Sequence, residues 1–164
     1  MDYSKFNTIK AFVFDVDGVL SDGKLTVQED DLVRVVSAKD GMGIRIAMDE
    51  GYHVFIITGG SSHNVEKRFK ELGVQEFHGA IWNKKDHLIE LLDKHKINAS
   101  EVLYCGDDIN DLDAIKMCGI GSCPRNAVVD IINNCDYICA VPGGEGCARE
   151  VIEKVMRIQN TWPI

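Results

Sequence analysis

Two short apolar runs in this sequence each end in a cluster of acidic residues. The run Ala11–Phe14 is followed by Asp15-Val16-Asp17-Gly18, and the run Val102–Cys105 is followed by Gly106-Asp107-Asp108-Ile109-Asn110-Asp111. Short, continuously apolar runs are typical of strands that are buried on both faces, as in a parallel sheet. Because the carboxyl ends of parallel strands meet at one edge of a sheet, we expect the two acidic clusters to share one crevice.

Strand-like and helix-like segments alternate along the chain, which predicts an α/β fold with a doubly wound, mostly parallel, Rossmann-like sheet. The predicted strands are Ala11–Asp15, Val54–Thr58 and Val102–Gly106, and the predicted helices are Gly41–Glu50, Ser62–Leu72, Lys84–His95, Asn110–Met117 and Gly146–Gln159. The segment around Phe77–Gly79 is expected to be a connection. We expect one domain over residues 1–164.

A different pattern occupies the segment after the first acidic cluster. Polar and apolar residues alternate in Lys24–Gln28 and again in Leu32–Val36, which predicts a β-hairpin that projects beside the crevice as a flap. The hairpin and one helix fill the chain up to the second predicted strand, and two helices fill most of the next interval. We therefore expect no inserted cap domain.

Composition narrows the partners that the chain can have. The sequence carries 26 acidic and 18 basic residues, for a net charge of −8, which argues against a nucleic-acid or membrane-surface partner. No two of the six cysteines have the C-x-x-C spacing of a zinc or redox site. The chain shows neither a signal-peptide pattern nor a long apolar run, so we expect a cytoplasmic protein with reduced thiols.

The convergence of five carboxylates demands a neutralising cation, and oxygen ligands favour Mg²⁺. Asp15 and Asp17 are two apart in an extended segment, so both can face one substrate, with one attacking and the other moving protons. In phosphoryl transfer, Asp15 would form an aspartyl-phosphate, while Asp17 would protonate the leaving group and then activate water. Mg²⁺ would be held by Asp15, Asp107 and the main-chain carbonyl of Asp17.

Two further segments can contribute to a phosphate site. Thr58-Gly59-Gly60-Ser61 joins a predicted strand to a helix, so its hydroxyl groups and exposed N–H groups can cradle a phosphate, although the same residues also occur in plain helix caps. Lys84 opens a predicted helix and can reach the crevice as a cation; the alternative is a solvated surface lysine.

Other motif interpretations of the first cluster fit the sequence less well. A calcium loop beginning at Asp15 needs Gly and Glu where Leu20 and Thr26 stand. A P-loop over residues 18–25 would have Leu25 in place of the metal-binding hydroxyl, and a strand pattern follows it. A purely structural role, in which the acids cap turns, remains an alternative.

Four segments in order, Asp15-x-Asp17-Gly18, Thr58-Gly59, Lys84 and Gly106–Asp111, resemble the motifs of the haloacid dehalogenase-like phosphohydrolase superfamily. Asp22-Gly23, residues 40–45 and residues 143–150 extend the resemblance to its capless branch, which acts on sugar-acid phosphates. The resemblance implies the following roles: Asp15 as nucleophile; Asp17 as acid/base; Thr58 and Lys84 as phosphate ligands; Gly59, Gly60 and Asn110 as further substrate contacts; Asp107 as metal ligand; and Asp108 and Asp111 as supporting residues.

The resemblance also implies a homotetramer in which a neighbour's hairpin, here Lys24–Ser37, covers the active site and the tail Gln159–Ile164 packs against a neighbour. Gly60 and Glu145 stand where octulosonate phosphatases commonly have arginine. The expected substrate is therefore a nonulosonate (sialic-acid-type) 9-phosphate such as 2-keto-3-deoxynononate 9-phosphate, with 3-deoxy-manno-octulosonate 8-phosphate as the alternative. From another class, similar domains attached to acylneuraminate cytidylyltransferases suggest a non-catalytic assembly domain. A phosphotransfer enzyme is a third option, disfavoured because no cap would exclude water.

Overall fold

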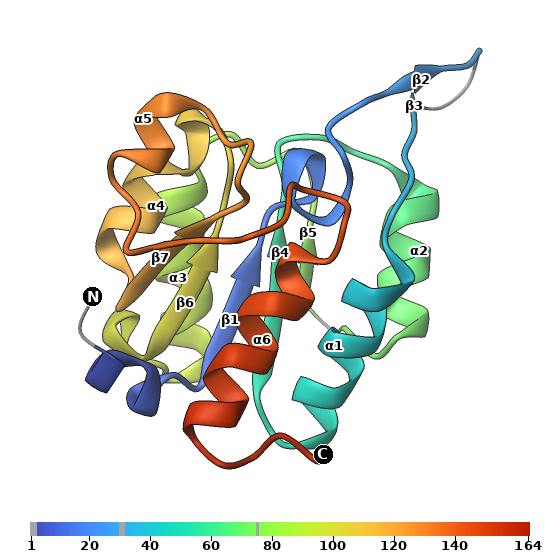
Figure 1. The fold of residues 1–164 in the computed structure, drawn as a ribbon. Helices are drawn as coiled ribbons and strands as arrows, with labels where there is room; N and C mark the ends of the chain where they lie inside the picture. The colour runs from blue at the N-terminus through green and yellow to red at the C-terminus, as the bar shows by residue number, and fades with distance from the viewer. Residues whose placement is uncertain (1–2, 30–31, 75) are drawn as a thin grey trace.

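A parallel sheet of six strands, in the order β5-β4-β1-β6-β7-β8, forms the centre of the computed structural model (Figure 1). The strands are β1 (Ala11–Phe14), β4 (His53–Ile57), β5 (Glu76–His78), β6 (Val102–Cys105), β7 (Ile120–Cys123) and β8 (Tyr137–Ile138). The structure describes residues 3–29, 32–74 and 76–164. The predicted α/β fold class is confirmed.

Both faces of the sheet are covered by helices, which produces two hydrophobic cores. Along β1, Phe12 and Phe14 belong to one core, while Ala11 and Val13 belong to the other, as the alternation of side chains along a strand requires. The first core includes residues of α1 (Ala38–Asp49), α2 (His63–Glu71) and α6 (Cys147–Ile158), and the second includes residues of α3 (Lys84–His95), α4 (Leu112–Met117) and α5 (Val129–Ile132). Burial on both faces explains the continuously apolar strand sequences.

The predicted hairpin is present and projects from the carboxyl edge of the sheet (Figure 1). Its strands β2 (Thr26–Val27) and β3 (Leu32–Val33) are shorter than predicted and pair antiparallel, with Thr26 opposite Val33. Residues 30 and 31, at its turn, lie outside the described residues. Between β1 and β4, the described residues form only a tight turn over Val16–Leu20, this hairpin and α1, so this part of the chain holds no cap domain.

The sequence missed three short strands. The expected connection around Phe77–Gly79 is wrong, because Glu76–His78 forms the edge strand β5. Strand β7 reads Ile-Gly-Ser-Cys, which lacks the apolar pattern of a strand, yet a Cβ at Gly121 would lie 2.5 Å from the side chain of Ile115. Close packing of α4 on the sheet therefore selects glycine there. Strand β8 has only two residues, too few for a periodic signal.

Helices α1 and α6 approach closely at two residues of the extended resemblance. A Cβ at Gly43 would lie 2.8 Å from Cδ of Arg149, so only glycine lets the two helices approach this closely. Helix α1 begins at Ala38 rather than at the predicted Gly41, so Asp40 lies within its first turn. The Asp40 carboxylate instead accepts a hydrogen bond from the backbone N–H of Arg149 at 2.7 Å, at the start of α6.

The C-terminal tail packs on its own chain, and the expected contact of this tail with a neighbour stays a prediction. The side-chain amide of Gln159 donates to the carbonyls of Phe6 and Ile9, at 2.7 and 2.9 Å. The Trp162 ring is 8% exposed and lies 4.4 Å below the Arg149 guanidinium. Within this tail, Asn160, Pro163 and Ile164 are exposed, and Ile164 is 90% exposed.

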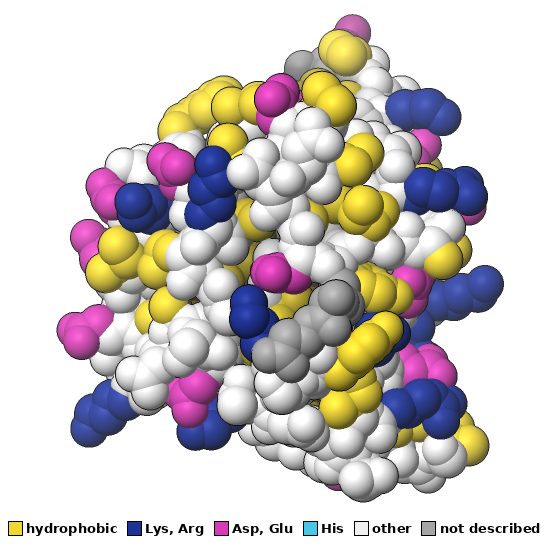
Figure 2. All heavy atoms as spheres, turned by 60° about the vertical axis from the view of Figure 1, so that its left-hand side comes forward, with side chains coloured by type: hydrophobic (Ala, Val, Ile, Leu, Met, Phe, Trp, Pro, Cys, Tyr) yellow, Lys and Arg dark blue, Asp and Glu magenta, His cyan; other side chains and the backbone are white. Residues whose placement is uncertain are grey.

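Charged side chains of both signs are interspersed with apolar ones on the face shown in Figure 2. The acidic excess is therefore distributed over this face rather than gathered in one stretch. Within the described residues, we find no helix that combines the length and the apolar character needed to cross a membrane.

Asp40 provides a test of the helix contact. Burial raises its pKa to about 6, while hydrogen bonds from the backbone of α6 oppose the rise. A raised carboxyl pKa contributes stability that is full below the unfolded-state pKa and is lost as the pH rises through 6. Between pH 4.5 and pH 7, the free energy of unfolding of wild type should fall by on the order of 2 kcal/mol relative to that of Asp40→Asn, because the amide of Asn imitates the neutral acid.

Urea unfolding of both proteins at the two pH values measures this difference. Asp113→Asn, a change at an exposed acid on α4, serves as the control and should follow wild type at both pH values. Equal pH dependence of wild type and Asp40→Asn would contradict the proposed burial of an ionisable group at this contact.

Candidate active site

The two acidic clusters meet at the carboxyl edge of the sheet. Strands β1 and β6 are neighbours with Phe14 opposite Cys105, and the N–H of Asp15 donates to the carbonyl of Cys105 at 3.1 Å. A cavity of about 570 Å³ lies over this edge. The residues that line it include eight from the predicted site: Asp15, Asp17, Thr58, Gly59, Gly60, Asp107, Asp108 and Asn110.

Asp15 is nearly buried and lies next to the cation of Lys84. One carboxylate oxygen accepts from the backbone N–H of Val16 at 2.7 Å, and the other lies 3.0 Å from Lys84 Nζ. Burial raises the pKa of Asp15 to about 7, and the Asp111 carboxylate adds to the rise, while Lys84 opposes it. The carboxylate is thus held in place and only partly neutralised by the chain's own groups.

Lys84 is the first residue of α3, as predicted, but it is not a surface lysine. Its ammonium group is fully buried and also donates to Asp111 Oδ1 at 2.7 Å. Burial lowers the pKa of Lys84, but Asp15 and Asp111 more than offset this, so the pKa lies above its ordinary value. Lys84 is therefore a buried cation in contact with Asp15, the carboxylate that the sequence predicts as the nucleophile.

Asp111 acts as a fully buried acceptor that ties this edge together. Besides Lys84, the hydroxyl of Tyr104 donates to it at 2.7 Å, and the backbone N–H of Asp107 donates at 3.2 Å. A Cβ at Gly106 would lie 2.4 Å from the Asp111 side chain, so glycine is required at that position. Its bonded neighbours agree with the supporting role expected from the sequence.

Asp107 has the features of a metal ligand. Its Oδ1 is buried and has no hydrogen-bond partner among the described residues, which is costly for a carboxylate unless a cation lies beside it. Burial raises the pKa of Asp107 to about 8, with Asp15 and Asp111 adding to the rise. Its Oδ2 lies where a Cβ on Gly18 would come within 1.9 Å, so Gly18 leaves room for this carboxylate.

The side chains of Asp15, Asp107 and Asp111 each offer an oxygen, and these oxygens lie within 4.8 Å of one another. This donor set, with the unpartnered oxygen of Asp107, fits a hard divalent cation such as Mg²⁺. From the sequence, we expected Asp111 to have only a supporting role and Asp17 to bind the cation through its main-chain carbonyl. Because the oxygens of Asp111 already accept from Lys84, Tyr104 and the backbone, Asp15 and Asp107 are the better candidates for direct ligands.

The loop after β4 also lines the cavity. The backbone N–H of Gly60 donates to the hydroxyl of Thr58 at 3.3 Å, and Ser62 caps α2 by accepting from the N–H of Val65 at 3.4 Å. A Cβ at Gly59 would lie 3.4 Å from Nδ2 of Asn110. Thr58, Gly59 and Gly60 thus line the cavity where we expect a phosphate, while Ser62 forms a plain helix cap.

Asp108 fits the capping alternative best. It is exposed, and its carboxylate accepts from the N–H of Ile109 at 2.7 Å as the cap of a short 3₁₀ turn over Ile109–Asp111. Asp108 therefore serves the local turn as well as lining the cavity, Asp107 lines the cavity, and Asp111 is fully buried.

Sequence reasoning missed three residues of the site. Arg34, on the hairpin, donates two hydrogen bonds to the Asp17 carboxylate, from Nε to Oδ1 at 2.6 Å and from Nη2 to Oδ2 at 2.9 Å. Trp82 and Ile109 line the cavity and are 79% and 55% exposed. The available signal for Arg34 was its place as the one charged residue in the apolar run Leu32–Val36.

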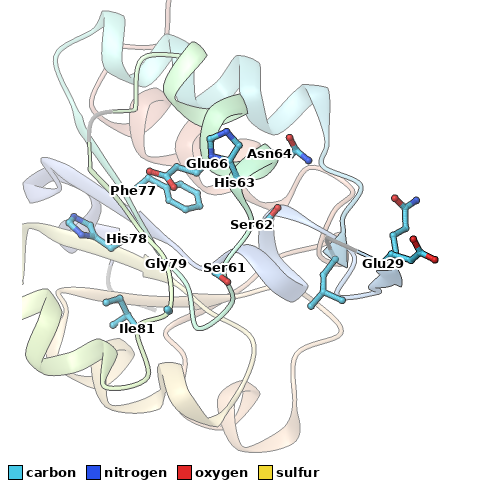
Figure 3. A pocket seen from close by; sticks show the side chains of 13 residues that line it. Glu29, Ser61, Ser62, His63, Asn64, Glu66, Phe77, His78, Gly79 and Ile81 are labelled. Atoms are coloured by element: carbon cyan, nitrogen blue, oxygen red, sulfur yellow. The ribbon is translucent and has the colours of Figure 1, made fainter.

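A larger hollow of about 1130 Å³ lies beside the site but contains none of the clustered acids. Figure 3 shows it from close by, with Glu29 of the hairpin on one side and Phe77 and His78 of β5 on the other. Ser61 and Ser62 line the hollow, and they belong to the same loop after β4 as the predicted phosphate cradle. The space between hairpin and sheet is therefore open.

A parallel, Rossmann-like α/β sheet with clustered acids, a buried lysine and a candidate cation site at one edge is typical of a metal-dependent hydrolase. A family model described as "haloacid dehalogenase-like hydrolase" matches residues 30–119. The chain belongs to this family, as the resemblance of its motifs predicted. The family and the acidic cluster confirm the predictions of a phosphatase-type enzyme and of Mg²⁺ as its cofactor.

Relatives of known name cover nearly the whole chain. The 3-deoxy-D-manno-octulosonate 8-phosphate phosphatase of Haemophilus influenzae is 30% identical over 157 residues, which are 95% of this chain and 87% of that protein. The Escherichia coli enzyme of the same name is 32% identical, over 96% of this chain and 84% of its own length.

A crystal structure of the enzyme of this name from Moraxella catarrhalis, in complex with magnesium ion, phosphate ion and KDO, superposes with a TM-score of 0.93. It is 36% identical to this chain and covers 96% of it and 91% of its own length.

The structure predicts how the protein responds to Mg²⁺. Because the cation binds only the folded chain, Mg²⁺ at about 100 times its Kd should add about 2.7 kcal/mol to the free energy of unfolding. Asp107→Asn should lose this gain and, in EDTA at pH 7, should be at least as stable as wild type, because it removes a buried carboxylate with an unpartnered oxygen.

Thermal and urea unfolding in EDTA and in Mg²⁺ measure both effects. The exposed acid Asp113 offers a matched control, and Asp113→Asn should keep the full stabilisation by Mg²⁺. A gain in Asp107→Asn as large as that of wild type would show that the cation does not bind at this carboxylate.

Proposed function

We propose that this protein hydrolyses the phosphate ester of a sugar acid and that its substrate is 3-deoxy-D-manno-octulosonate 8-phosphate. This choice of substrate is supported by the similarity to phosphatases of that name over nearly the whole chain. The site supports the chemistry, since Asp15 and Asp17 face the same cavity as the Thr58 cradle. We further propose that residues 1–164 act as one catalytic domain.

In the proposed reaction, a carboxylate oxygen of Asp15 attacks phosphorus and the bond to the sugar oxygen breaks. The departing oxygen takes a proton from Asp17, which leaves phosphate as an acyl phosphate on Asp15. Asp17 then accepts a proton from water as the water attacks phosphorus, which releases inorganic phosphate and restores both carboxyl groups. Each step thus uses both of the acids that follow β1.

The remaining residues neutralise and orient the phosphate. Lys84 lies 3.0 Å from Asp15 and partly cancels the repulsion between the carboxylate and a dianionic ester. Thr58, Gly59, Gly60 and Asn110 line the cavity, where they can contact phosphate oxygens. In this structure the N–H of Gly60 donates to the hydroxyl of Thr58 at 3.3 Å. Mg²⁺ bound by Asp15, Asp107 and the Asp17 carbonyl would supply further positive charge at the phosphoryl oxygens.

The comparisons favour the octulosonate, which the sequence alone ranked second. A nonulosonate 9-phosphate stays a prediction, based on the absence of arginine at Gly60 and Glu145. The structure gives a reason to discount part of that argument, because Arg34 brings a guanidinium to the side of Gly60. A missing cation at residue 60 therefore does not by itself imply a different sugar acid.

The activity is tested by phosphate release from both sugar-acid phosphates. Wild type should release phosphate from the octulosonate 8-phosphate in Mg²⁺, should not in EDTA, and should have a lower kcat/KM for the nonulosonate 9-phosphate. Asp15→Asn should lower kcat more than about 10³-fold, because it removes the nucleophile. Its circular dichroism spectrum should match wild type.

Two outcomes would redirect the assignment. Faster turnover of the nonulosonate would restore the expectation from the sequence. Binding of both compounds without release of phosphate would favour the non-catalytic assembly domain instead.

We also propose that the protein forms a homotetramer in which the hairpin of one subunit covers the site of another. The hairpin carries apolar side chains that its own chain leaves exposed: Leu25, Val27, Leu32, Val33 and Val35, with Val27 80% and Val35 76% exposed. Exposed apolar surface of this kind is typical of an interface. The open hollow beside the hairpin leaves space for such a partner.

Replacing both strongly exposed valines, in Val27→Asp/Val35→Asp, should convert the oligomer to smaller species, because it places charges in the proposed interface. Light scattering coupled to gel filtration measures the mass. Val129→Asp, at a residue of α5 that is 65% exposed, is the matched control and should keep the wild-type mass. A monomeric wild type would refute the proposed assembly.

A further inference from the structure

An ion pair joins the hairpin to the site. Arg34 follows β3 and reaches back to Asp17, whose two carboxylate oxygens accept from Nε at 2.6 Å and Nη2 at 2.9 Å. The Arg34 side chain is 3% exposed, and that of Asp17 is 29% exposed. Paired donors of this geometry fix the plane of a carboxylate as well as its position.

Gly60 provides the space for this pair. A Cβ on Gly60 would lie 2.6 Å from Arg34 Nη2 and 3.0 Å from Asp17 Oδ2. Three loops thus meet at one point: the loop after β1 with Asp17, the loop after β4 with Gly60, and the hairpin with Arg34. Any larger residue at position 60 has to displace either the guanidinium or the carboxylate.

Other contacts of Asp17 are weaker. The hydroxyl of Ser21 lies 3.4 Å from Asp17 Oδ1, which is long for an O–H donor. Arg34 itself is tied to its strand, because Nη1 donates to the carbonyl of Leu32 at 2.8 Å. Since rotation about the last torsion of an aspartate is soft, the orientation of the Asp17 oxygens is set mainly by a residue of the hairpin.

We propose that Arg34 is a positioning residue for Asp17 and that Gly60 is kept small to admit it. This inference rests on the proposed function, in which Asp17 donates a proton to the departing sugar oxygen. A carboxyl group that rotates away from that oxygen cannot deliver the proton, so loss of Arg34 should harm the step that needs an acid. The competing explanation is that Arg34 only anchors the hairpin.

The two explanations differ in how the loss of Arg34 depends on the leaving group. The sugar oxygen of 3-deoxy-D-manno-octulosonate 8-phosphate needs a proton as it departs, whereas p-nitrophenolate leaves without one. Arg34→Gln should lower kcat for the sugar phosphate about tenfold or more, and kcat for p-nitrophenyl phosphate less than about threefold. Arg45→Gln, which removes an exposed arginine paired with Asp49 on α1, is the control and should change neither.

A double-mutant cycle tests the role of Gly60. Gly60→Ala should lower kcat for the sugar phosphate, and adding it to Arg34→Gln should cause little further loss, because both changes break the same contact. Arg34→Lys keeps the charge but loses the paired geometry, so it should fall between wild type and Arg34→Gln. This variant also serves if Arg34→Gln does not fold.

The result that overturns the inference is an equal loss of kcat for both esters in the Arg34 variants, or additive losses in the cycle. Either result would leave Arg34 as an anchor of the hairpin. Failure of the proposed function is separate, since it would appear as absent turnover of the sugar phosphate by wild type.

Discussion

The site depends on the buried contact of Lys84 with Asp15 and Asp111. These three side chains come from the start of α3, the end of β1 and the turn before α4, so one cation joins three segments. Removing one partner of such a buried pair leaves an uncompensated charge, at a cost of about 3 to 5 kcal/mol. The same contact places a cation beside the residue that we assign as nucleophile, so stability and chemistry are linked here.

Close backbone approaches decide where the remaining carboxylates lie. Gly18 and Gly106 each stand where a Cβ would collide with an aspartate side chain, that of Asp107 and Asp111 respectively. The loops can therefore fold tightly around two acids that repel each other, and the free oxygen of Asp107 is left facing the site. Negative charge accumulates at this edge because the fold holds the carboxylates together, which is the condition for binding a small divalent cation.

Much of the fold and part of the site could be predicted from local pattern. The apolar runs before Asp15 and Asp107 predicted adjacent strands, and the helix beginning at Lys84 was predicted with its observed bounds. Short strands were missed because two to four residues carry no reliable periodicity. Arg34 and Asp40 were not seen as partners of Asp17 and Arg149, because those contacts join residues 17 and 109 apart in the sequence.

The sequence by itself determined the strands β1, β4 and β6, the longer helices and the presence of two acidic clusters at strand ends, because apolar patterns and local residue types control them. Only the tertiary structure decided that Asp107 has a buried oxygen without a partner among the described residues, whereas Asp108 is exposed and caps a turn. It also decided that Lys84 is buried and that the hairpin holds Asp17. These outcomes depend on burial and on contacts between distant segments, which no local pattern records.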